Sequence, residues 1–87
     1  MASTISQIKQ QVNQIGQNAS TVATQLSQLA SNIEKQIAAI QNAIGGTSTG
    51  EDKEMIASFQ QADKAIKDAS VSLQAASKAA KDWSAKA

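Results

Sequence analysis

The distribution of helix-breaking residues constrains this chain most, because it allows only one clear interruption of helical structure. The 87 residues contain no proline and only four glycines. Three of these glycines gather in the segment 45–50, and they are Gly45, Gly46 and Gly50. Glycine at the end of a helix tolerates the left-handed conformation that closes the last turn. We therefore predict one domain over residues 1–87, with a helix over about 3–44, a turn over 45–50 and a helix over about 50–84.

Local signals support this boundary. Ser48 or Thr49 can cap the second helix, because acidic residues follow each of them at the three-residue spacing of a capping box. Gly16 stands inside the first segment, where glycine costs about 1 kcal/mol relative to alanine. The apolar pattern continues in phase on both sides of Gly16, so we expect the helix to run through it.

Apolar residues recur in steps of three and four in both segments, which is typical of one helical stripe. In the first segment they are Ile5, Ile8, Val12, Ile15, Ala19, Val22, Leu26, Leu29, Ile33, Ile37, Ile40 and Ile44. In the second they are Met55, Phe59, Ala62, Ile66, Ala69, Leu73, Ala76, Ala80 and Trp83. Folding the chain back with Ile44 opposite Glu51 aligns the two stripes, which predicts an all-α antiparallel two-helix hairpin. Trp83 then closes the open end against Val12, or alternatively anchors into a partner.

A second stripe of small and apolar residues lies beside the first and predicts a partner interface. Its members are Gly16, Ala23, Ala30, Ile37 and Ile44 on the first helix and Ile56 on the second. A self-sufficient coiled coil usually carries charged residues at such flanking positions. We expect the hairpin to complete a four-helix bundle by dimerisation or by binding a helical partner. The alternative is that these alanines reflect only helix propensity on a solvated face.

The composition disfavours several classes of function. The chain has no histidine and no cysteine, which removes the commonest general base and the commonest soft metal ligands. We expect a non-catalytic protein without a cofactor or a metal. The formal net charge of +1 provides no field for nucleic-acid binding. No stretch has the length and apolarity of a membrane span, and residues 1–6 lack the features of a signal peptide.

The chain resembles the WXG-type helical hairpins of the type VII secretion system. Ile44-Gly45-Gly46 departs from their hallmark, with Ile44 where the tryptophan would stand, but Phe59 and Asp63 match an F-x-x-x-D signal. The chain is most similar to the Lap family, small helical targeting factors associated with LXG-domain toxins. This resemblance implies binding to the helical N-terminal domain of a toxin, sometimes beside a second small helical protein. It also implies that Phe59 and Asp63 act as an export signal for the secretion ATPase.

Several alternatives stay open at this point. Phe59 is in phase with the apolar stripe, so it can belong to the core instead of a signal. The resemblance implies a protein that is cytoplasmic before export and then secreted or surface-bound by a route independent of a signal peptide. Two other classes of function are a self-assembling helical structural protein and a membrane-active amphipathic protein. The sequence does not distinguish a homodimer from a heterocomplex, and it does not identify the toxin.

Overall fold

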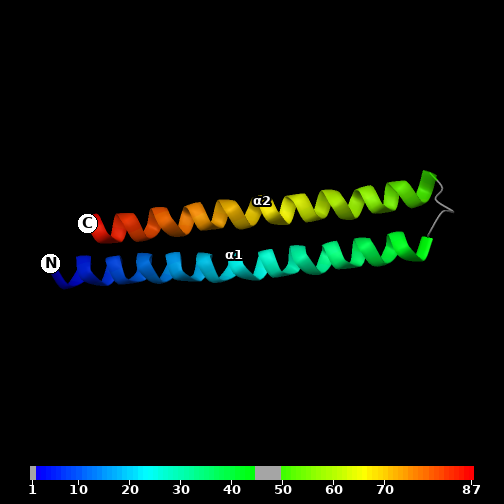
Figure 1. Ribbon diagram of the computed structural model, residues 1–87. Coiled ribbons are helices and arrows are strands. Elements are labelled where there is room, and N and C mark those ends of the chain that lie inside the picture. Colours follow the sequence, from blue (N-terminus) through cyan, green and yellow to red (C-terminus); the bar gives the residue numbers. More distant parts are fainter. Residues whose placement is uncertain (1, 45–49) are drawn as a thin grey trace.

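The protein folds as two long helices that run antiparallel, side by side, in a computed structural model that describes residues 2–44 and 50–87 (Figure 1). Helix α1 covers Ala2–Ile44 and helix α2 covers Gly50–Lys86. The predicted all-α hairpin is confirmed. Of the predicted turn glycines, Gly45 and Gly46 lie outside the described residues, as do Ser48 and Thr49, and Gly50 is the first residue of α2.

The helices are long because nothing within them breaks the pattern. Helix α1 continues through Gly16 without interruption. Helix α2 has Glu51 and Asp52 in its first turn and Lys86 in its last, and these charges oppose the helix dipole at both ends. Ion pairs four residues apart support α2 between positions 63 and 82. They join Lys64 to Asp68 at 2.8 Å, Lys67 to Asp63 at 3.3 Å and Lys78 to Asp82 at 2.9 Å.

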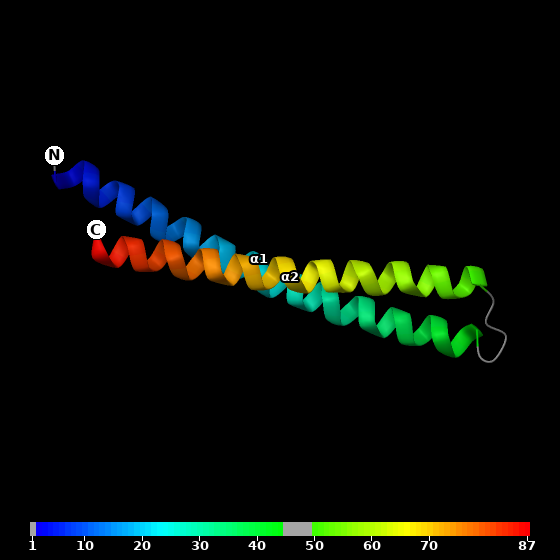
Figure 2. The same cartoon turned by 90° about the horizontal axis from the view of Figure 1, so that it is seen from above.

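The molecule is a rod, with extents of 69 × 16 × 14 Å. Its radius of gyration is 19.6 Å, compared with about 12 Å for a compact chain of this length. Viewed from above, the helices cross near their middles and diverge toward both ends (Figure 2). A rod of two helices has no enclosed centre, so packing is confined to the single line of contact between α1 and α2, which we call the seam.

The axial alignment of the helices agrees with the sequence to within one residue. The predicted pairing of Ile44 with Glu51 places Gly16 opposite Ala79. A Cβ atom added at Gly16 would stand 3.2 Å from the Cβ of Ala80. The displacement of one helix along the other therefore agrees with the pairing counted from the sequence.

The rotation of the helices about their own axes differs from the prediction. The buried apolar residues are Ala23, Ala30 and Ile37, and the buried polar ones are Ser70 and Ser77. Several large residues predicted for the seam are exposed instead, namely Ile5, Ile8, Ile15, Val22, Leu29, Met55 and Trp83. Both helices are turned so that the predicted second stripe forms the seam and much of the predicted seam faces outward.

This finding corrects the assignment of the partner interface. Gly16, Ala23, Ala30 and Ile37 are buried against α2, and Ile44 and Ile56 are half-buried at the loop end of the same seam. None of these six residues forms an uncovered face. The physical reason is size, because small side chains let two helix backbones approach closely. At Gly16 the backbone oxygen of Ser77 is only 3.2 Å from where a Cβ would stand.

We predict that Gly16→Leu destabilises the hairpin, because the new side chain must push α2 away from α1. Overpacking of this kind typically costs about 1–3 kcal/mol. The matched control is Gln17→Leu, which adds the same side chain at the neighbouring exposed position and should change stability by less than about 0.5 kcal/mol. Urea unfolding followed by circular dichroism measures both variants at one protein concentration. Equal midpoints for the two would contradict the close approach at Gly16.

Candidate helix-binding face

Most of the exposed large apolar residues lie in two rows, one on each helix, and the row on α2 also contains three exposed alanines. The row on α1 consists of Ile8, Ile15, Val22 and Leu29. The row on α2 consists of Met55, Ala62, Ala69, Ala76 and Trp83. All nine residues are exposed, and we call the two rows together the apolar face.

The two rows lie on the same side of the hairpin. Ile15, Val22 and Leu29 each directly precede a buried seam residue, and the same is true of Ala69 and Ala76 on α2. One step along a helix is a rotation of about 100°. A two-fold axis perpendicular to the plane of an antiparallel pair exchanges the helices and leaves each side of the pair in place. Residues one before the seam therefore share one side on both helices.

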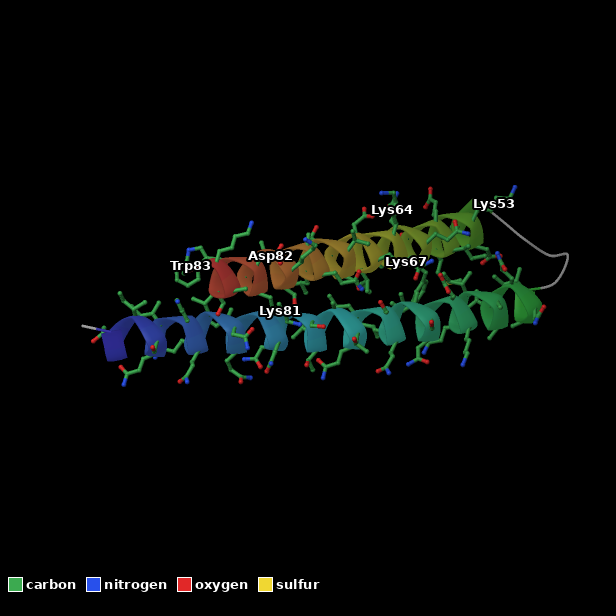
Figure 3. All side chains as sticks on the ribbon, turned by 60° about the vertical axis from the view of Figure 1, so that its left-hand side comes forward. Lys53, Lys64, Lys67, Lys81, Asp82 and Trp83 are labelled. Atoms are coloured by element: carbon green, nitrogen blue, oxygen red, sulfur yellow. The ribbon has the colours of Figure 1, made fainter. Side chains whose placement is uncertain are left out.

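The opposite side is polar, and an ion pair between the helices identifies it independently. Glu34 follows Ala30 by four residues and Lys67 precedes Ser70 by three, which rotates both away from the apolar face. Their side chains form a salt bridge, and Lys67 points from α2 toward α1 (Figure 3). The hydrogen bond between them lowers the pKa of Glu34 and raises the pKa of Lys67, so both groups are charged at neutral pH.

Charged residues are kept away from the apolar face. Asp63 lies in the seam itself, and the charged residues of α2 between positions 64 and 82 stand one, four or five positions after a seam residue, on the polar side or the back of the helix. They are Lys64, Lys67, Asp68, Lys78, Lys81 and Asp82. The outer borders of the apolar face are uncharged along most of their length. They consist of Thr4, Gln11, Asn18, Gln25 and Asn32 on α1 and Ser58, Ala65, Ser72 and Ala79 on α2.

The side chains of the apolar face are exposed enough that covering them would release a favourable hydrophobic free energy. Ile15 is 62% exposed, Leu29 45% and Val22 42%. Burying the remaining surface of each such side chain would contribute about 1 kcal/mol. Single exposed apolar residues are ordinary, and Val71 on the polar side is one of them. A continuous apolar patch is different, because it marks an interaction surface.

Serine hydroxyl groups make directional hydrogen bonds between the two helices inside the seam. Ser70 Oγ donates a hydrogen bond to the backbone oxygen of Ala23 at 2.8 Å and lies 2.9 Å from Ser27 Oγ. About four turns further along α2, Ser84 Oγ donates to the backbone oxygen of Lys9 at 2.8 Å. These bonds reach the backbone of α1 directly, which is possible only because the helices approach closely. They add directional contacts to the apolar contacts that residues such as Ile37 make in the seam.

The two residues of the expected export signal lie along the seam of α2. Phe59 is half-buried, and the side chain of Asp63 is 14% exposed. Asp63 Oδ2 contacts the ammonium group of Lys67 at 3.3 Å, while its Oδ1 is buried and accepts no hydrogen bond. Both residues therefore take part in the packing of the hairpin, the role that the sequence offered as the alternative to a signal.

Trp83 occupies a different place from the one predicted. It is 47% exposed at the open end of the hairpin, on the apolar face (Figure 3). The neighbouring Ser84 takes the inward position and bonds to α1. The prediction that Trp83 closes the hairpin against Val12 is therefore corrected. Its alternative role as an anchor for a partner stays a prediction, favoured by the frequency of tryptophan among interface hot spots.

The sequence contains a signal for the true orientation of the helices that our interpretation did not use. The uncharged borders lie beside Ile15, Val22 and Leu29, whereas the lysines of α2 lie on the other side of the seam. A row of large apolar residues with uncharged borders is more consistent with an open interface than with a closed seam. The three-and-four spacing and the alignment of the two stripes predict these residues inside the hairpin instead.

Comparisons with known proteins add nothing to the description of the fold given by the structure. No protein-family model, no curated protein and no solved structure matches the chain. Over residues 2–44 and 50–87, neither helix has a stretch long and apolar enough to cross a membrane. The same residues form no pocket and no cluster of metal-ligating side chains. The described surface is thus a helical hairpin whose distinguishing feature is one apolar side.

We predict that Ser70→Ala lowers the free energy of unfolding by about 1 kcal/mol more than Ser72→Ala does, because it removes the hydrogen bonds to Ala23 and Ser27. Both substitutions are in the same helix, so the gain in helix propensity cancels between them. Ser72 is exposed. Chemical denaturation of both variants measures the difference. A Ser70→Ala variant as stable as Ser72→Ala would show that these bonds contribute nothing to the hairpin.

Proposed function

We propose that this protein is a non-catalytic targeting factor that binds the helical N-terminal domain of an LXG toxin and accompanies it into type VII secretion. The apolar face carries the proposal. A hairpin with one long apolar side is half of a four-helix bundle, and a second pair of amphipathic helices completes it. The resemblance to the Lap family supplies the identity of that second pair.

The shape of the face suits helices better than a globular partner. The α1 row follows its helix from Ile8 to Leu29 and supplies large residues, whereas the α2 row runs from Met55 to Trp83 and supplies mainly alanines. Alanine leaves space for the side chains of an approaching helix, and the α1 row offers side chains to fill the partner's spaces. The uncharged borders add no repulsion toward a partner of either sign.

Phe59 and Asp63 are proposed as the export signal, read at the edge of the seam. Phe59 stands in the half-buried row next to the apolar face, so a bound toxin would lie beside it. A receptor would then recognise a composite surface made from the hairpin and its partner. This arrangement accounts for a signal inside α2 instead of beyond its end.

The first prediction from this proposal concerns binding. Val22→Glu should abolish co-purification with the helical N-terminal domain of an LXG toxin encoded beside this gene, because it places a charge in the middle of the apolar face. Val71→Glu makes the same change on the polar side, where Val71 is 65% exposed, and should bind normally. Co-expression and pull-down compare the two, with helicity checked by circular dichroism. Equal binding by both variants would refute the proposed face, and no binding by the wild type would refute the toxin partner.

The second prediction concerns export. Asp63→Asn should abolish secretion of the toxin while leaving the hairpin folded and bound to it, because the substitution keeps the shape of the side chain and removes its charge. Asp68→Asn, on an aspartate whose side chain is 67% exposed, should be secreted normally. Immunoblots of culture medium and cells measure export. Normal secretion of Asp63→Asn would assign Asp63 to hairpin packing alone.

A further inference from the structure

We propose that the apolar face of one molecule packs on the apolar face of a second copy of this chain, with a two-fold axis parallel to the helices. The α1 row of one copy then lies over the α2 row of the other. Both loops are at the same end of the dimer. This inference rests on the two rows and their alignment. It does not depend on the export role.

The alignment of the rows follows from the seam. Gly16 is level with Ala80, because a Cβ at Gly16 would stand 3.2 Å from the Cβ of Ala80. Counting along both helices from this contact places Val22 level with Gln74. It likewise places Leu29 level with Lys67 and Ile15 level with Lys81. The levels of Ile15, Val22 and Leu29 thus each fall between two members of the α2 row, whereas Ile8 lies beyond Trp83.

A two-fold axis parallel to the helices keeps every residue at its own level and places α1 of one copy over α2 of the other. Val22 then inserts between Ala69 and Ala76 of the partner copy. Leu29 inserts between Ala62 and Ala69, and Ile15 inserts between Ala76 and Trp83. Large side chains meet the spaces between alanines in two layers and the space between Ala76 and Trp83 in the third, which is the interdigitation that a packed helix interface requires.

The other two-fold arrangement lacks this match. An axis perpendicular to the helices and lying in the interface places α1 over α1 and α2 over α2. Isoleucine, valine and leucine would then face one another, while alanines faced alanines across an unfilled gap. Both arrangements make neighbouring helices antiparallel, so the distribution of side-chain size decides between them.

The available area and the charges are also compatible with a second copy. A rod of 69 × 16 × 14 Å presents a long side of about 1,000 Å², and a stable interface needs about 800 Å² per partner. Two copies of a charged face would repel one another, but here the face carries no charge and its borders are charged only at the ends of α2, at Glu51 and Lys86. The charged residues of both copies remain on the outside of the dimer, in water.

Solution mass provides the first test. Purified protein alone should be a dimer at about 100 μM by analytical ultracentrifugation, since interfaces of this size bind in the micromolar range or more tightly. Val22→Glu should be a folded monomer and Val71→Glu a dimer. A monomeric wild type, or a monomeric Val71→Glu, would overturn the proposal. Because no toxin is present, either result leaves the export role to its own tests.

Cysteine crosslinking tests the arrangement, since the chain has no cysteine of its own. Val22→Cys and Ala76→Cys proteins are mixed in a redox buffer and the disulfide-linked species are identified by mass. The proposed dimer gives mainly the mixed Val22–Ala76 product, because disulfides require Cα atoms about 4.4–6.8 Å apart. The two copies of Val22 lie diagonally across the bundle and should not pair. A predominance of Val22–Val22 product, or a lack of specific product, would refute this geometry.

A lipid surface is the competing occupant, and vesicles of phosphatidylcholine with phosphatidylglycerol test it. The dimer hides the apolar face, so the wild type should not sediment with these vesicles. The proposal would be overturned if the wild type sedimented with the vesicles and dissociated from its dimer on binding them, while Val22→Glu did not sediment. That result would assign the face to membranes.

Discussion

The close approach of two helix backbones determines most of what this structure can do. Gly16, Ala23 and Ala30 on α1 meet Ser70 and Ser77 on α2, and the serine hydroxyl of Ser70 bonds directly to the backbone of α1. Larger residues in these places would separate the helices and break that bond. Once the small residues occupy the seam, rotation of each helix is fixed. The large apolar residues one position earlier must then point to one side.

This arrangement is the reverse of a self-contained coiled coil, in which the largest apolar residues face each other. Here the seam buries little apolar area, and several of the largest side chains remain about half exposed. Small domains are marginally stable when their cores are this limited. Covering the apolar face would therefore add hydrophobic stabilisation to the hairpin, which would link its stability to the proposed binding.

The sequence predicted the helices and their alignment because these depend on local and countable features. The missing prolines, the glycine cluster and the three-and-four spacing define the two helices, and the register follows from counting back from the loop. Rotation about the helix axis depends on a finer choice. Residues such as Val12, Leu26 and Ile33 lie between the predicted seam and the observed one. The three-and-four spacing is therefore compatible with both rotations of the helix. The rotation depends on whether burying the large residues or bringing the two helix backbones close together is more favourable. At Gly16 and Ala23 the backbones come close together.

The proposed dimer and the proposed toxin complex use the same face, so the two states exclude each other. A toxin domain must therefore bind more favourably than a second copy does, since linkage makes its apparent affinity fall as the dimer becomes more stable. The alanine row of α2 allows this difference, because alanines accept the side chains of a new helix without rearranging. Trp83 and Met55, at the two ends of the row, offer larger contacts that a longer partner could use. In this proposed scheme, the second copy covers the apolar face until a toxin domain with higher affinity displaces it.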